Sequence, residues 1–107
     1  MAAVSTHVLD TVSGMPASDM AVTLERLEEN GPSTMGSAST DEGGRVADLL
    51  GGNRLRTGVY RLVFNTAAYG NNFYPEVAIV FRVSDPDQNH HIPLLLSAYG
   101  YSTYRGS

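Results

Sequence analysis

Three histidines, His7, His90 and His91, are the side chains of this sequence best suited to acid–base chemistry near neutral pH. An unperturbed imidazole has a pKa of about 6.5, so a neutral histidine can take a proton from water. The sequence has no cysteine, which excludes thiol nucleophiles, disulfides and thiolate metal sites. It also lacks a Gly-x-Ser-x-Gly elbow, a His-Glu-x-x-His pair and a glycine-rich phosphate loop. The histidines are therefore the first candidates for chemistry.

Strand parity separates the three histidines. Side chains alternate between the two faces of a strand, so the neighbours His90 and His91 cannot both bind one metal in a regular strand. If Val8 and Ile92 face the core, His7 and His91 both point outward. The side chains that share these outward faces are Ser5, Leu9, Pro93 and Leu95. A single histidine in a strand is more often structural or solvated than catalytic, and parity alone does not bring two histidines to one cleft.

Short runs of alternating apolar and polar residues, separated by Gly, Pro, Asn and Asp clusters, predict about eight β-strands. The predicted strands span residues 4–10, 20–27, 34–40, 45–50, 59–65, 76–84, 91–97 and 99–105. We expect a turn at 28–32, and residues 66–71 hold the one helical turn that the pattern allows. This organisation is typical of a two-sheet sandwich or a barrel.

The predicted strand 91–97 carries apolar residues on both faces. Its two rows are Ile92, Leu94 and Leu96 on one face and Pro93 and Leu95 on the other. A strand of an antiparallel sandwich normally exposes one face to water. We therefore expect a second copy of the chain to cover the outer face, with tolerated surface apolarity as the alternative interpretation.

The composition predicts one ordered globular domain spanning 1–107, because 42% of the residues are hydrophobic and 17% are charged. A net charge of −4 gives no electrostatic basis for binding nucleic acid or an anionic membrane. No apolar run approaches the ~20 residues of a membrane helix. Residues 1–6 lack the basic and apolar segments of a secretory signal, so a cytoplasmic location is expected.

Four segments resemble the 5-hydroxyisourate hydrolases of the transthyretin-like family. They are Thr6-His7-Val8-Leu9-Asp10, Asp41-Glu42-Gly43-Gly44-Arg45, Tyr74-Pro75-Glu76-Val77 and the ending from Ile92 to Ser107. The segments follow the expected order along essentially the whole chain. The terminal Tyr104-Arg105-Gly106-Ser107 is the most specific, because it separates the enzymes from the transthyretin hormone carriers. The sequence departs from the family at Asn89-His90, where the enzymes often have His-Tyr, and at Ala98, where Pro is usual.

The resemblance implies an all-β, transthyretin-like two-sheet sandwich, assembled as a homotetramer with active sites in a channel between dimers. It implies that His7, Arg45, His91 and Ser107 are catalytic, and that His7, Arg45 and Tyr104 bind the substrate. The hormone carriers have Lys, Glu, Thr and Thr at the positions of His7, Arg45, His91 and Tyr104. This sequence has the enzyme-type residue at all four.

The implied reaction is hydrolysis of a cyclic amide bond of 5-hydroxyisourate, giving 2-oxo-4-hydroxy-4-carboxy-5-ureidoimidazoline in urate degradation. His7 and His91 would together bind and activate the water, and the Arg45 guanidinium would stabilise the developing oxyanion. Tyr104 and Ser107, the latter through its hydroxyl or the terminal carboxylate, would close the pocket. The scheme needs no metal and no cofactor.

Two other functions fit the same fold. A small-ligand, thyroid-hormone-like carrier would use the channel without turnover, and Lys and Glu at positions 7 and 45 would have favoured it. An interaction module would need exposed aromatic loops. Tyr69, Phe73 and Tyr74 are candidates for such loops, and they also fit internal packing.

Overall fold

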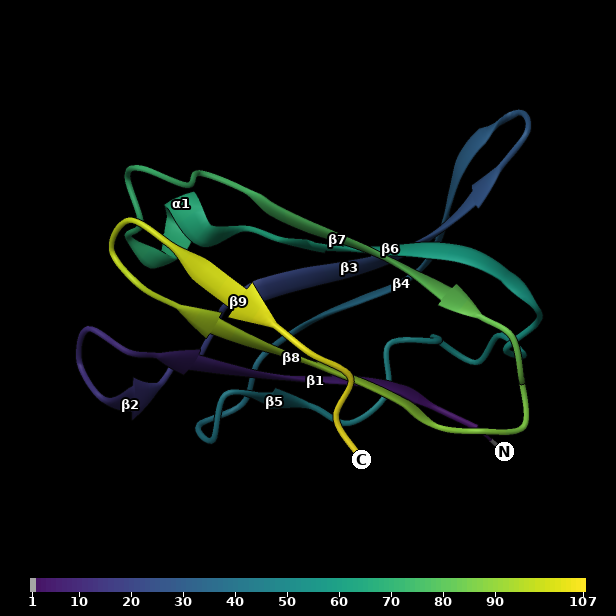
Figure 1. Ribbon diagram of the computed structural model, residues 1–107, viewed down its shortest axis with the longest axis horizontal. Coiled ribbons are helices and arrows are strands. Elements are labelled where there is room, and N and C mark those ends of the chain that lie inside the picture. Colours follow the sequence, from purple (N-terminus) through teal and green to yellow (C-terminus); the bar gives the residue numbers. More distant parts are fainter. Residues whose placement is uncertain (1) are drawn as a thin grey trace.

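The computed structural model describes residues 2–107, and Met1 lies outside them. Its strands form two sheets that pack face to face (Figure 1). The five-stranded sheet contains β1 (Val4–Asp10), β2 (Met15–Pro16), β5 (Arg45–Val46), β8 (His90–Leu96) and β9 (Tyr101–Thr103). The four-stranded sheet contains β3 (Ala21–Glu28), β4 (Gly31–Ser39), β6 (Gly58–Phe64) and β7 (Val77–Val83). The predicted all-β sandwich is confirmed.

A parallel pair, β1 and β8, lies at the centre of the five-stranded sheet. The strand order is β2-β1-β8-β9, with β5 paired to the same edge of β1 as β2, and the other sheet has the order β4-β3-β6-β7. The register of the parallel pair aligns Ser5 with His91 and His7 with Pro93. The antiparallel β1–β5 pair sets Arg45 opposite His7. Residues far apart in the sequence therefore meet on one sheet.

The hydrophobic core lies between the sheets. The inward-facing core residues of β1 and β8 are Val4, Thr6, Val8, Ile92, Leu94 and Leu96, and those of β3 and β6 are Val22, Leu24, Tyr60, Leu62 and Phe64. Pro93, on the outer row of β8, is also buried within the single chain, and Leu95 is half-buried. Burying one such large apolar side chain contributes about 1.5–3 kcal/mol. His90 belongs to the inner row and is only 5% exposed, whereas His91 is half-buried on the outer face. The parity prediction for the two neighbouring histidines is confirmed.

Several predicted element boundaries are wrong, and the last strand, expected at 99–105, contains only Tyr101–Thr103. The turn expected at 28–32 is shorter, because Gly31 and Pro32 already belong to β4 and pair with β3. Pro32 is tolerated there since β4 is an edge strand. The strand expected at 45–50 contains only Arg45–Val46. Asp48 ends it: its carboxylate accepts hydrogen bonds from the backbone N–H groups of Val4 and Leu50, which competes with sheet pairing.

The short helix α1 (Thr66–Tyr69) follows β6 and ends two residues before the predicted limit of 71. The Asn65 side chain caps its start by accepting the N–H of Ala68 at 3.2 Å. Gly70 ends it with a φ of 124°, a left-handed conformation that favours glycine. Within residues 2–107 no helix is long and apolar enough to cross a membrane.

Candidate active site

His7 and Arg45 face each other across the β1–β5 pair. Directly opposed residues of an antiparallel pair project from the same face of the sheet, so both side chains lie on the outer face of the five-stranded sheet. The His7 ring is half-buried and the Arg45 side chain is exposed. A guanidinium and an imidazole are thus neighbours on a surface that solvent or a ligand can reach.

The loop before β5 fixes the position of Arg45. The Asp41 carboxylate accepts the backbone N–H groups of Gly43 and Arg45, each at 2.9 Å. Gly44 has a φ of 77°, and a Cβ there would lie 2.4 Å from the carbonyl oxygen of Val8. Only glycine satisfies both the conformation and this close approach. The loop conformation that positions Arg45 therefore requires Asp41 as hydrogen-bond acceptor and glycine at position 44.

His91 lies at the centre of the candidate site. Its Nδ1 is 2.8 Å from the hydroxyl of Ser5 on β1. On its other side the C-terminal segment runs alongside, and the Gly106 N–H donates to the His91 carbonyl at 2.8 Å. The contact with Ser5 leaves Nε2 as the ring nitrogen available for other partners.

An open cavity of about 810 Å³ lies over this part of the outer face. It is lined by Ala3, Ser5, Arg45, Ala47, Gln88, Asn89, His91, Arg105, Gly106 and Ser107. Its rim is held by two side-chain contacts. Asn89 Oδ1 accepts the N–H of Ala3 at 2.8 Å, and the Arg105 guanidinium donates to Gln88 Oε1 at 3.0 Å. The cavity therefore brings Arg45, His91 and Ser107 together, with His7 next to its lining.

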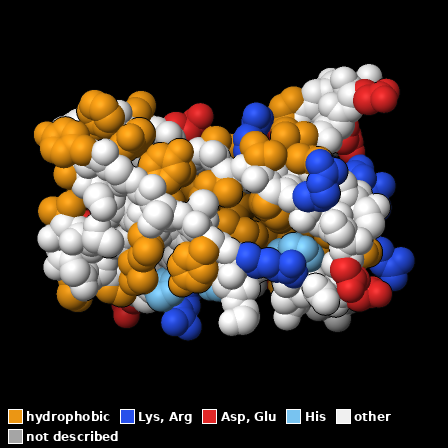
Figure 2. All heavy atoms as spheres, viewed as in Figure 1, with side chains coloured by type: hydrophobic (Ala, Val, Ile, Leu, Met, Phe, Trp, Pro, Cys, Tyr) orange, Lys and Arg blue, Asp and Glu red, His pale blue; other side chains and the backbone are white. Residues whose placement is uncertain are grey.

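The surroundings of His91 favour its neutral form. Burial of the ring is the largest cause that lowers the pKa of His91 below 6.5, and the nearby charges of His7 and Arg45 lower it further. A neutral imidazole at pH 7 is the form that can accept a proton. In Figure 2, histidine side chains reach the surface next to basic side chains, on a face that also carries many hydrophobic groups.

Tyr104 lies apart from this cavity within one chain. Its side chain is 58% exposed and lines a smaller groove of about 240 Å³, which runs between β7 and the C-terminal segment. His91 and Arg105 border both spaces. Of the five residues named by the resemblance, three line the larger cavity, namely Arg45, His91 and Ser107. His7 is paired with Arg45 beside that cavity, and Tyr104 lines the neighbouring groove.

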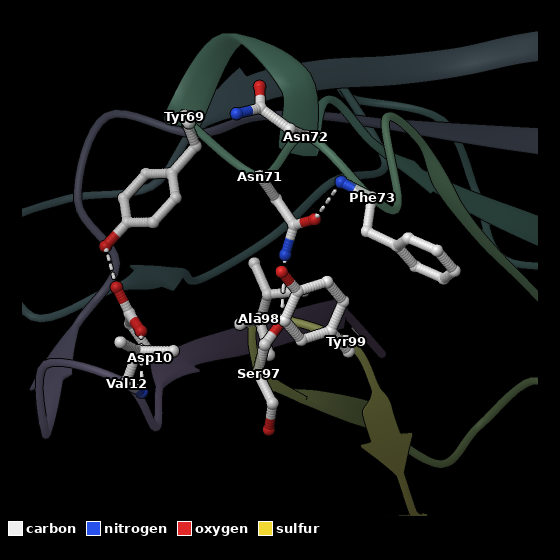
Figure 3. Close-up of a pocket in the computed structure, with 11 residues that line it drawn as sticks. Asp10, Val12, Tyr69, Asn71, Asn72, Phe73, Ser97, Ala98 and Tyr99 are labelled. Carbon is white, nitrogen blue, oxygen red and sulfur yellow. Dashed lines mark hydrogen bonds between the residues drawn. The ribbon is translucent and has the colours of Figure 1, made fainter.

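A third cavity, of about 420 Å³, lies at the end of the sandwich that carries α1 (Figure 3). Two hydrogen bonds cross it: the Tyr69 hydroxyl donates to Asp10 at 2.9 Å, and the Asn71 side chain donates to the backbone carbonyl of Ser97 at 2.9 Å. These contacts hold α1 and the residues after it against the ends of β1 and β8. We assign this region a structural role.

Two residues of the candidate site were missed by sequence reasoning. Ser5 shares the strand face of His7, but strand parity did not show that it contacts His91. Gly106 borders the His91 ring through a pairing of the C-terminal segment that no local pattern predicts. In the part of the chain that the structure describes, no group of three or more His, Asp or Glu side chains is arranged to hold a metal ion.

Comparisons with known proteins identify the family of the chain and agree with its two-sheet fold. A model of the HIUase/Transthyretin family matches residues 4–106, and the chain belongs to this family. The 5-hydroxyisourate hydrolase of Salmonella dublin is 40% identical over 108 residues, which cover 96% of this chain and 79% of the relative. The structure of Klebsiella pneumoniae 5-hydroxyisourate hydrolase matches with a TM-score of 0.84 at 32% identity, over 100% of both chains. Sea bream transthyretin in complex with thyroxine matches with a TM-score of 0.86 at 28% identity, over 96% of this chain and 93% of that one.

Proposed function

We infer that the chain is an enzyme that hydrolyses 5-hydroxyisourate to 2-oxo-4-hydroxy-4-carboxy-5-ureidoimidazoline, a step of urate degradation in purine metabolism. The observation that carries this inference is the grouping of His7, Arg45 and His91 on one outer sheet face beside an open cavity. The similarity to hydrolases of this name from Salmonella dublin and Klebsiella pneumoniae supports it. A carrier function fits less well, because positions 7 and 45 hold His and Arg instead of the Lys and Glu expected of the carriers.

The histidines supply the proton transfers of the proposed reaction. A water molecule attacks the ring carbonyl and loses one proton, the carbon–nitrogen bond breaks, and the leaving nitrogen gains a proton. In this proposal His7 and His91 bind and activate the water together, and the lowered pKa of His91 favours the neutral imidazole that accepts a proton near pH 7. The imidazolium that results then returns the proton to the leaving nitrogen.

Arg45 and the C-terminus bind the substrate in this proposal. The guanidinium stays charged and presents a planar set of donors, which suits the carbonyls of the substrate and the oxyanion that develops during attack. Ser107 lines the same cavity as Arg45, which supports its proposed role in closing the site around the substrate. Tyr104 contributes to substrate binding across the groove that it shares with His91.

We propose that the protein acts as a homotetramer, in which other copies cover the outer face and close the channel. Three tyrosines on or beside β9 that are at least 42% exposed support this, namely Tyr99, Tyr101 and Tyr104, and the exposed Phe73 packs against Tyr99. Figure 2 shows hydrophobic groups gathered over the end of the molecule that carries α1. Surface patches of this kind mark interfaces more often than free surface. The single-domain organisation and the cytoplasmic location stay predictions.

An ultraviolet assay on freshly generated 5-hydroxyisourate tests the proposed reaction. Purified protein at micromolar concentration, without added metal, should accelerate the loss of the substrate above its spontaneous decay. A matched sample of the His7→Ala/His91→Ala double variant should return the decay to the spontaneous rate. Unchanged decay with wild-type protein whose fold is verified by circular dichroism would contradict the proposed function.

A further inference from the structure

The His91 ring stands between two neighbouring chain segments. On one side Ser5 of β1 is its direct partner in the parallel register, and on the other side Gly106 is its partner in an isolated antiparallel bridge. Three residues in a row across the sheet, Ser5, His91 and Gly106, therefore determine how the ring is oriented. The ring emerges from the outer face between the two segments.

Both edges of the His91 ring contact neighbouring residues. The Nδ1 edge meets the Ser5 hydroxyl, with 2.8 Å between the nitrogen and the oxygen. The Cδ2 edge meets Gly106, where a Cβ would lie only 2.4 Å from Cδ2. A side chain at position 106 would push the ring out of place, and a ring flipped by 180° would lose the hydrogen bond to Ser5. The geometry selects one orientation, with Nε2 away from Ser5.

We propose that Ser5 is a positioning residue that sets the tautomer of His91, by accepting a hydrogen bond from Nδ1–H and leaving Nε2 unprotonated for the reacting water. This proposal rests on the proposed function, in which a neutral imidazole removes a proton from water. The hydrogen bond made by one ring nitrogen decides which proton-transfer role is open to the other. Ser5 thereby specifies Nε2 of His91 as the general base.

The contact suits both protonation states of the reaction. When Nε2 takes the water's proton, Nδ1 keeps its own, so Ser5 accepts the same hydrogen bond from the neutral ring and from the imidazolium. Hydrogen bonds from a charged donor are stronger, so the contact stabilises the imidazolium that forms. The titratable and charged side chains near the ring are His7, Arg45 and Arg105, and Nδ1 is hydrogen-bonded to Ser5 and to none of them. Ser5 is therefore the residue that accepts the hydrogen bond from Nδ1–H in this proposal.

Nitrogen-15 NMR of the labelled full-length protein reads the tautomer directly, without substrate. We expect the Nδ1–H form of His91 in the wild type and in Ser5→Thr, which keeps a hydroxyl. In Ser5→Ala the population should shift towards the Nε2–H form, which is the more stable one for a free side chain in water. The His91 signals are assigned by their loss in His91→Gln. The proposal would be overturned by an Nε2–H tautomer in the wild type. It would also be overturned if the Nδ1–H tautomer of the wild type persisted unchanged in Ser5→Ala.

Kinetics of the same variants give the second readout. Removing a hydrogen-bond partner that orients a functional histidine typically costs about 10–100-fold in activity. We expect kcat of Ser5→Ala to fall by this factor and Ser5→Thr to recover most of the loss. Ser37→Ala, an exposed serine on a strand of the other sheet, is the matched control and should leave kcat unchanged. A wild type that does not turn over 5-hydroxyisourate overturns the proposed function, whereas an active wild type with full activity in Ser5→Ala overturns only the role of Ser5.

Discussion

His91 is the residue on which the proposed chemistry depends most, because its surroundings control both its orientation and its charge. Ser5 and Gly106 fix the ring from two sides. Burial, followed by the charges of His7 and Arg45, keeps its pKa below 6.5. The low pKa has a cost, since a weaker base takes protons less readily, and a benefit, since the neutral form dominates at pH 7.

The charge of Arg45 should affect the pH dependence of kcat/KM. Because neutral His91 is the active form, kcat/KM should rise with pH through the His91 pKa, with the midpoint of the acid limb below 6.5. Arg45→Gln removes a nearby positive charge, so the midpoint should move upward, although burial of the ring persists. Arg45→Lys keeps the charge but loses the planar fork, so kcat/KM should fall while the midpoint stays near the wild-type value. Equal midpoints in the Gln and Lys variants would contradict the electrostatic coupling.

At the scale of the elements, a hydrogen bond between Tyr69 and Asp10 is one of the contacts that hold α1 in place. Burial alone would raise the pKa of Asp10, but the hydrogen bonds from Tyr69, Ser13 and Val12 outweigh it and lower the pKa below 3.8. Tyr69 also belongs to the end of α1, so this bond joins the helix to the end of β1 (Figure 3). The contact is part of the frame that holds the sheet carrying the candidate site.

Tyr69→Phe should therefore lower the free energy of unfolding at pH 7 by about 1.5 kcal/mol, the lower end of the range for a hydrogen bond to a charged group, because both side chains are only half-buried. A carboxylate with a lowered pKa stabilises the fold above its unfolded pKa of 3.8, and this stability is lost as pH falls through the folded pKa. The difference between wild type and variant should shrink below pH 3.8. Urea unfolding at a fixed protein concentration measures it, with the exposed Tyr99→Phe as control. A difference that is the same at pH 7 and pH 3 would show that the ionised Asp10 is not involved.

Periodicity predicted most of the strands because their two faces differ in polarity. Met20, Val22 and Leu24, for example, were expected on one face and are all buried. The strand expected at 45–50 failed because Leu49 and Leu50 are buried from a loop, so their apolar character came from the core and not from strand pairing. Hydrophobicity reports burial directly, and secondary structure only through the period of the pattern.

Only part of the candidate site could be predicted from the sequence. Parity placed His7 and His91 on outer faces and His90 inside, but it gave no information about which strands are neighbours. The parallel β1–β8 pair joins residues from the two ends of the chain, and the bridge to Gly106 joins β8 to the segment that follows β9. Both pairings depend on the whole topology. The contact of Ser5 with His91 follows from that register and from no local signal.

At the scale of the whole molecule, the exposed apolar side chains predict assembly. Sedimentation velocity should show a tetramer at micromolar concentration. Phe73→Glu introduces a charge into the patch that contains Tyr99, whose ring centroid is 5.5 Å away, and should shift the distribution to smaller species. Glu29→Gln, in the exposed turn between β3 and β4, should leave it unchanged. A wild-type monomer that is fully active at nanomolar concentration would contradict a channel shared between subunits.

The proposed catalysis depends on two histidines, His7 and His91, on the outer face of the five-stranded sheet. The most direct test is kcat of His91→Ala against His90→Ala, because these neighbours lie on opposite faces, with His90 only 5% exposed and bound through Nδ1 to the Gln88 carbonyl. A general base contributes about 10²–10⁴-fold, so His91→Ala should lose kcat in that range. His90→Ala should lose stability and keep kcat close to that of the wild type wherever it remains folded. Equal losses of kcat from the two variants, in folded proteins of the same oligomeric state, would contradict the assignment of His91 to the site.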